Sequence, residues 1–87
     1  MAKKIYVGNL NFNTTEDSLR DLFAVHGTVL TSDIVMDRYT GRSRGFGFVE
    51  MEDETAADAA ITALDETEFD ARNLRVNEAH SKQDRSY

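Results

Sequence analysis

Hydrophobic and polar positions alternate with a period of two along four short segments, residues 3–10, 29–36, 44–51 and 72–79. This alternation is typical of β-strands that have one buried face. In each segment one apolar set predicts which face is buried. These sets are Ile5 and Val7, Ile34 and Met36, Val49 and Met51, and Leu74 and Val76.

Two stretches between these strands have helical spacing instead. Thr14 or Thr15 is a suitable N-cap for the first helix, which ends before Gly27, and Asp53 or Thr55 is suitable for the second. The apolar stripes are Leu19, Leu22 and Phe23 in the first helix, and Ala57, Ala60, Ile61 and Leu64 in the second. The order predicts an α+β fold of the ferredoxin-like β-α-β-β-α-β type, a four-stranded antiparallel sheet with both helices on one face. The other face of the sheet is then left open.

The segment RGFGFVEM, residues 44–51, raises the question of which strand face lies on the core. One face holds Arg44, Phe46, Phe48 and Glu50, and the other holds Gly45, Gly47, Val49 and Met51. Taken alone, an alternating phenylalanine pair is more often core than surface. Burying these rings, however, would also bury Arg44 and Glu50 unpaired, and it would expose Val49. We therefore expect both rings on the open face, and the glycines on the covered face, where they let side chains such as Phe12, Leu22, Phe23, Ile61 or Leu64 approach closely.

The overall charge at first argues against a nucleic-acid partner, because 10 basic residues stand against 16 acidic ones. The distribution changes this picture. Segments 11–30 and 50–71 hold 12 acids and one base, and the rest of the chain holds nine bases and four acids. If these two sets of segments lie on opposite sides of the fold, the protein has a positive face. On that face we expect the rings of Tyr6, Phe46 and Phe48 among the cations Lys4, Arg44 and Arg75, the combination that single-stranded nucleic acid requires.

The two motifs that carry these rings resemble those of a known family. Residues 44–51 resemble the RNP1 pattern of the RNA recognition motif at every position but the last, Met51, and residues 5–10, IYVGNL, resemble its RNP2 partner. The likeness spans nearly the whole chain and is closest to the small single-domain bacterial and plant glycine-rich RNA-binding members. We expect residues 1–80 to form the domain and the polar residues 81–87 to form a flexible tail.

The resemblance implies a role for each site residue. Tyr6 and Phe48 match the rings on which two successive bases stack, Phe46 the ring beside the sugars, and Arg44 a residue that faces phosphate. Arg75, Asn77, Glu78 and Ala79 match the strand and exit that read base edges. Arg38 and Arg42, in the loop between the second and third strands, are either phosphate contacts or solvated charges.

We expect a binding protein and not an enzyme, with no catalytic residues, metal or cofactor. The expected partner is single-stranded RNA, with single-stranded DNA left open, and no membrane or small-molecule substrate. The role would be post-transcriptional regulation or RNA chaperoning by a cytoplasmic monomer. The apolar stretch near the N-terminus is too short for a signal peptide or a membrane span, which favours an intracellular protein. His26 and His80 are expected to be surface residues. The alternative is a protein-interaction module that uses the acidic helical face while the sheet binds nothing.

Overall fold

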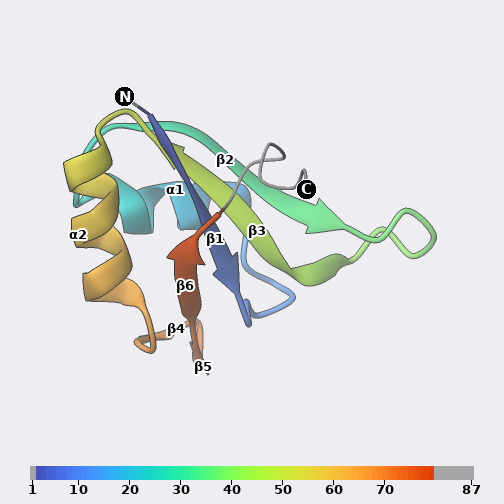
Figure 1. Cartoon of the computed structure of the whole chain (residues 1–87). Helices are drawn as coiled ribbons and strands as arrows, with labels where there is room; N and C mark the ends of the chain where they lie inside the picture. Colours follow the sequence, from blue (N-terminus) through green and yellow to red (C-terminus); the bar gives the residue numbers. More distant parts are fainter. Residues whose placement is uncertain (1, 80–87) are drawn as a thin grey trace, which may run out of the picture.

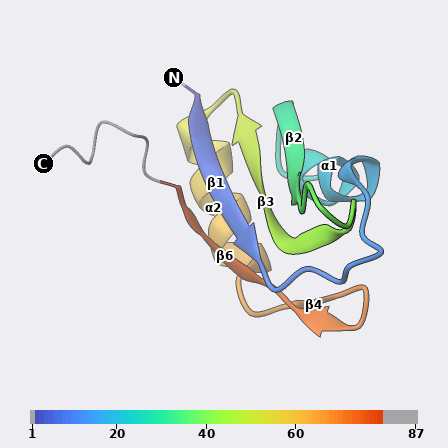
Figure 2. The same ribbon diagram turned by 90° about the vertical axis from the view of Figure 1, so that its right-hand side faces the viewer.

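The computed structural model describes residues 2–79, and its two helices and the four strands of the main sheet follow one another in the predicted order (Figure 1). The main sheet consists of β1 (Lys3–Gly8), β2 (Val29–Met36), β3 (Ser43–Met51) and β6 (Arg75–Glu78), with the order β2-β3-β1-β6 and antiparallel pairing throughout. The helices α1 (Glu16–Ala24) and α2 (Glu54–Leu64) both lie behind this sheet when its open face is viewed (Figure 2). The α+β, ferredoxin-like prediction is confirmed.

Side chains at the first turn of each helix determine where it begins. The Thr15 hydroxyl accepts a hydrogen bond from the backbone N–H of Ser18 at 3.1 Å, and an Asp53 carboxylate oxygen accepts one from Ala56 at 3.3 Å. Each bond satisfies an N–H group that has no partner within the helix. Of the two N-cap candidates for each helix, the structure thus selects Thr15 and Asp53.

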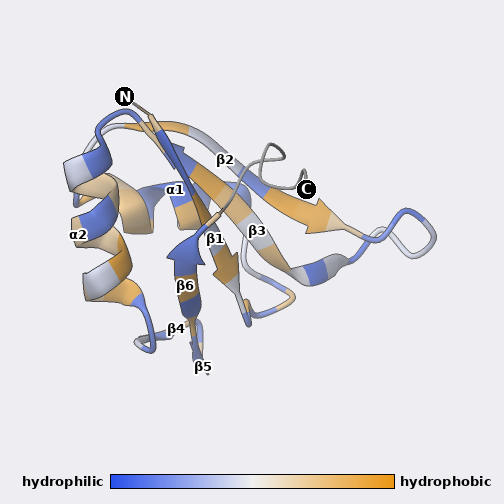
Figure 3. Cartoon of the chain, viewed as in Figure 1, coloured by the Kyte–Doolittle hydropathy of each residue, from blue (hydrophilic) through white to orange (hydrophobic). Residues whose placement is uncertain are grey.

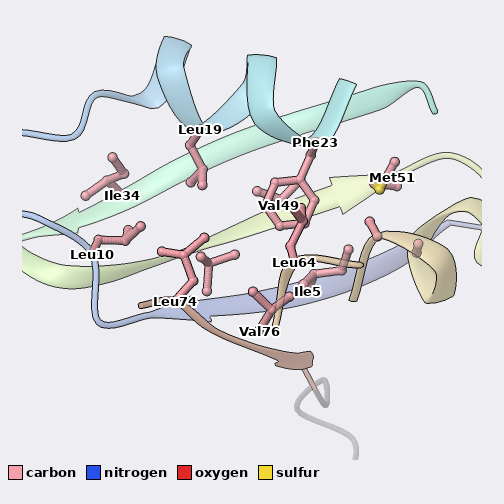
Figure 4. Close-up of a cluster of buried hydrophobic side chains, with 13 residues drawn as sticks. Ile5, Leu10, Leu19, Phe23, Ile34, Val49, Met51, Leu64, Leu74 and Val76 are labelled. Atoms are coloured by element: carbon pink, nitrogen blue, oxygen red, sulfur yellow. The ribbon is translucent and has the colours of Figure 1, made fainter. Parts of the chain in front are cut away.

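The core lies between the helices and the covered face of the sheet (Figure 4). It consists of Ile5, Val7, Leu10, Leu19, Phe23, Ile34, Val49, Met51, Ala57, Ala60, Leu64, Leu74 and Val76. Seven of the eight strand residues predicted for the core are among these. The exception is Met36, whose prediction is wrong because the side chain is 55% exposed. A register shift between Ile34 and Met36 ends the regular alternation there, and the hydrophobic end of β2 runs beyond the helices (Figure 3).

The two glycines of β3 have different neighbours on the covered face. A β-carbon on Gly45 would lie 3.4 Å from a ring carbon of Phe12, as expected. A β-carbon on Gly47 would instead collide with the backbone of β2 at Asp33 and Ile34. The prediction that helix side chains approach Gly47 is therefore wrong, and the close neighbour is the adjacent strand.

A second, two-stranded sheet was not predicted. It pairs β4 (Glu68–Phe69) with β5 (Arg72–Asn73) through a turn at Asp70 and Ala71, whose φ angles are 53° and 69°. Asn-Gly, Asp-Gly or Gly-Gly usually occupies such a turn, and the alanine at the second position removes the usual sequence signal. The last strand of the main sheet consequently begins at Arg75 and not at residue 72.

Three expectations concern membrane spans and the C-terminal end of the chain. In residues 2–79, neither helix has the length and apolar character needed to cross a membrane. The predicted flexible tail, residues 81–87, and the prediction for His80 lie outside the described residues.

Candidate nucleic-acid interface

The open face of the sheet carries a continuous row of side chains across its four strands. Tyr6 lies opposite Phe48 on one side and Asn77 on the other, and Phe48 lies opposite Asp33. Residues directly opposite each other in an antiparallel sheet point to the same face. Since Ile5 and Val7 are fully buried against the helices, this row faces away from them, toward the viewer in Figure 2.

Three aromatic rings form a cluster at the centre of this face, which we call the ring cluster: Tyr6, Phe46 and Phe48. The ring centroid of Tyr6 lies 5.9 Å from the centroid of each phenylalanine ring, and the two phenylalanine centroids are 6.2 Å apart. The rings are half-buried and not fully exposed, because each covers part of the others. The sequence correctly predicts the face but gives no indication of this mutual contact.

The planes of the three rings point in different directions. The interplanar angle is 35° between Tyr6 and Phe46, 64° between Tyr6 and Phe48, and 89° between the phenylalanines. Such tilted and edge-to-face pairs are favourable for aromatic rings. A base that stacks on Tyr6 and another that stacks on Phe48 would therefore be turned relative to each other.

Gly8 leaves the space on the sheet that the Tyr6 ring occupies. A β-carbon at this position would collide with the ring and hydroxyl of Tyr6. The ring can therefore lie along β1 over Gly8 only because that residue has no side chain.

The cations predicted for this face lie around the ring cluster. The Lys4 ammonium is 5.7 Å from the Phe48 ring centroid, within cation–π range. Arg75 lies opposite Gly8 on β6, with its guanidinium 3.9 Å from the Glu66 carboxylate, and Arg44 is exposed near the start of β3.

Lys3 shows how the neighbouring position differs. Its side chain belongs to the covered side of β1, where Nζ donates to the Asp58 carboxylate of α2 at 2.7 Å and lies 3.6 Å from Glu78. The hydrogen bond to Asp58, followed by the charges of both acids, raises the pKa of Lys3 above its ordinary value of 10.5. Lys3 is thus engaged with the helix, whereas Lys4 faces the open side.

The separation of charge is less complete than the sequence predicts. Glu50, from a segment assigned to the acidic side, lies opposite Lys4 on the open face, and Asp33 lies opposite Phe48. The alternation along β3 predicts that Glu50 lies on the same face as the rings. Its position in the strand, and not the acidic segment to which it belongs, determines its face. The open face is therefore only weakly positive.

Arg38 and Arg42 do not join the sheet face. Both are exposed in the hairpin loop between β2 and β3, which projects from the rest of the molecule (Figure 1). Asp37 organises this loop: its backbone N–H donates to Arg42 at 2.7 Å, and its side chain accepts from the N–H of Tyr39 at 2.8 Å. The two arginines therefore lie in an ordered loop, away from the ring cluster.

The interface has the features of a binding surface. In residues 2–79, no three acidic or histidine side chains are gathered where they could hold a metal ion. What the arrangement offers is flat apolar rings, nearby cations, and the amide of Asn77 and the carboxylate of Asp33 at either end of the central row.

Comparison with known proteins gives a consistent result. The family model described as RNA recognition motif matches residues 5–75. Glycine-rich RNA-binding protein 1 of Mycosarcoma maydis is 54% identical over 82 residues, which are 94% of this chain but 47% of that protein. The chain thus spans about half the length of that relative.

Two solved structures extend the comparison. The crystal structure of RNA binding protein PG1 is 51% identical, with a TM-score of 0.88 over 91% of this chain and 95% of that chain. The structure of the Rna15 RRM with bound RNA (GU) is 27% identical, with a TM-score of 0.80 over 90% of this chain and 83% of that one. The family and the fold are therefore both established.

Proposed function

The chain belongs to the RNA recognition motif family, and we propose that it binds single-stranded RNA on the open face of its sheet through the ring cluster. The observation that carries this proposal is the position of Tyr6, Phe46 and Phe48 within about 6 Å of one another on a face that no helix covers. Folding alone does not require three half-exposed rings on this open face. The bound RNA of a structurally similar domain supports the same use.

We assign to each ring the role that the resemblance to the family implies. Two successive bases stack on Tyr6 and Phe48, and Phe46, edge-on to Phe48, contacts the sugars between them. Stacking is worth about 1–3 kcal/mol for each base. Lys4, Arg44 and Arg75 contact phosphates.

The polar residues at the ends of the central row recognise base edges. The Asn77 amide can donate and accept, whereas the Asp33 carboxylate can only accept. A base with an exocyclic amino group is therefore favoured beside Phe48, which lies opposite Asp33.

The acidic composition sets the strength of binding. Three cations around the ring cluster, opposed by Asp33 and Glu50, neutralise few phosphates. Since phosphate contacts provide most of the non-specific affinity, we expect micromolar or weaker binding that depends mainly on stacking. Single-stranded DNA would stack on the same rings, so selectivity for RNA would have to come from contacts to the 2′-hydroxyl.

We extend the proposal to the oligomeric state, location and cellular role of the protein. It acts as a monomeric binding domain of residues 1–80 in the cytoplasm, in post-transcriptional regulation or as an RNA chaperone, without catalysing a reaction itself. The name of its fungal relative, an RNA-binding protein, supports the binding role.

Titration of the purified chain with a short single-stranded RNA, followed by amide chemical shifts, tests the proposal. We expect saturable shifts at Tyr6, Phe48 and Asn77 and little change along α2. A sheet that stays silent would contradict the proposal, and it would favour the alternative in which the acidic helical face binds a protein.

A further inference from the structure

We propose a second nucleotide site beyond the sheet, between the β1–α1 loop and the β2–β3 hairpin, in which a base stacks on Phe12. This inference rests on the proposed RNA binding and adds one nucleotide to it. The site is a hollow of about 290 Å³ lined by Phe12, Asp37, Thr40, Arg42, Ser43 and Arg44. Its volume is near the lower end for ligand pockets, which suits one base and its phosphate better than a larger ligand.

Phe12 is unusual because it is an aromatic residue of the loop that is 64% exposed and yet held in place. One ring edge lies over Gly45, where a β-carbon would be 3.4 Å from Phe12 Cε1. Gly45 has a φ of +86°, a conformation that favours glycine. Most of the side chain is open to solvent, so the ring offers a stacking surface beside β3.

Hydrogen bonds on both sides of Phe12 hold the loop that carries it. The backbone N–H of Leu10 donates to the carbonyl of Gly45 at 2.7 Å, which ties the loop to β3. The Asn11 side chain accepts from the N–H of Asn13 at 2.9 Å, and the Asn11 carbonyl accepts from Thr14 at 3.0 Å. These bonds order the backbone that carries the ring, so the loop loses less conformational entropy when a base stacks on Phe12.

The charges around the hollow fit a phosphate. Arg42 and Arg44 are both exposed and line it from the hairpin side, and guanidinium groups suit phosphate oxygens well. The Thr40 hydroxyl, which accepts from the N–H of Arg42 at 3.2 Å, keeps its own proton free to donate. Asp37 is the acid among the lining residues, and its Oδ1 already accepts from Tyr39.

The hollow and the ring cluster share a cation. Arg44 lines the hollow and lies two residues before Phe46 on the same strand, a distance of about 7 Å along β3. A strand of RNA that leaves the rings toward the hairpin would therefore meet Arg44 and then pass around the end of β3 to reach Phe12, which lies against Gly45. Tyr39, at the hairpin tip, is 90% exposed but is not among the lining residues, which makes it a matched aromatic control.

The test compares two RNA lengths on single-residue variants. A dinucleotide covers the ring cluster alone, whereas a hexanucleotide reaches the hollow. We expect Phe12→Ala to weaken binding of the hexanucleotide by about fivefold to a hundredfold, as for loss of one stacked base, and to leave dinucleotide binding unchanged. Phe12→Tyr should restore the affinity, and Tyr39→Ala should leave both affinities as in the wild type.

Two further outcomes separate the possible failures. Phe12→Leu keeps an apolar contact over Gly45 but has no ring, so it serves as a control in case the alanine variant fails to fold. If Phe12→Leu binds the hexanucleotide as tightly as the wild type does, stacking at Phe12 is overturned. Equal losses for both RNA lengths would overturn a separate site. If the wild type binds neither RNA, the proposed function itself fails. If it binds both and Phe12→Ala binds both equally well, only the second site is wrong.

Discussion

The two faces of β3 are built from neighbouring residues but serve different purposes. On the covered face, Val49 and Met51 are fully buried and Gly47 allows the backbone of β2 to approach. On the open face, Phe46 and Phe48 are larger than those residues, yet they contact mainly each other and Tyr6. Side-chain size therefore does not decide burial in this sheet. The position of the helices decides it, through the parity of each strand.

The largest effect is expected from the covered face. Ile5 is fully buried in the core, opposite Val49. Ile5→Ala should lower the free energy of unfolding by about 2–5 kcal/mol, because the removed atoms leave a cavity. Chemical denaturation measures this loss. RNA affinity, corrected for the folded fraction, should be unchanged, and a loss of affinity in the folded protein would show that the two faces are not independent.

A smaller loss of stability is expected from Gly47→Ala. The added β-carbon would collide with the backbone of β2 at Asp33 and Ile34, and overpacking of this kind costs about 1–3 kcal/mol. The β2–β3 pairing should be the part that loosens, which amide hydrogen exchange along β2 would detect. Gly41→Ala provides a control for added bulk alone, since a β-carbon there meets nothing within 4 Å although its φ of +73° adds some strain. Protection of β2 equal to the wild type in Gly47→Ala would contradict the assignment.

The comparison also shows how far each residue could be predicted from the sequence. A period of two carries the parity of a strand directly, so the face of Phe46, Phe48 and Tyr6 followed from the alternation and from the charges that flank them. The exposure of Met36 did not follow, because a register shift breaks the alternation before it. The β4–β5 hairpin turns at residues without glycine, so no local signal predicted it.

Other parts of the interface depend on contacts between distant segments. The half-burial of the three rings results from the register that sets Tyr6 opposite Phe48, and a sequence does not specify register by itself. The site at Phe12 requires that the β1–α1 loop lie on Gly45. The positive φ of Gly45 and the exposure of Phe12 become visible only in the folded chain.

Lys3 and Lys4 differ in their electrostatic surroundings. They are adjacent on β1 but belong to opposite faces, Lys3 beside Asp58 and Lys4 beside Phe48. With three cations on the open face, log affinity should fall with log salt at a slope of about −2, and Lys4→Gln should reduce its magnitude by about 0.7. Lys3→Gln should leave the slope unchanged. Equal changes in both variants would mean that RNA does not distinguish the two faces.

The smallest effect concerns the titration of Lys3. Its pKa is raised above 10.5 by the hydrogen bond to Asp58, so its contribution to stability is complete below that pH and is lost only as the pH rises through the higher, folded-state value. Asp58→Asn should lower the pKa, as measured by side-chain NMR. Asp21→Asn, on α1, should leave it unchanged. A Lys3 that titrates below 10.5 in the wild type would contradict the ion pair.

The most direct test compares Phe48→Ala with Val49→Ala, neighbours on opposite faces of β3, by measuring RNA affinity and unfolding free energy on both. The account predicts that Phe48→Ala loses about 1–3 kcal/mol of binding and only about 1 kcal/mol of stability, from its ring contacts. Val49→Ala should lose about 1.5–3 kcal/mol of stability and no affinity once folded. If Phe48→Ala instead loses about 3–5 kcal/mol of stability, as a core phenylalanine does, and its folded fraction binds RNA as tightly as the wild type, the open face is not the binding surface.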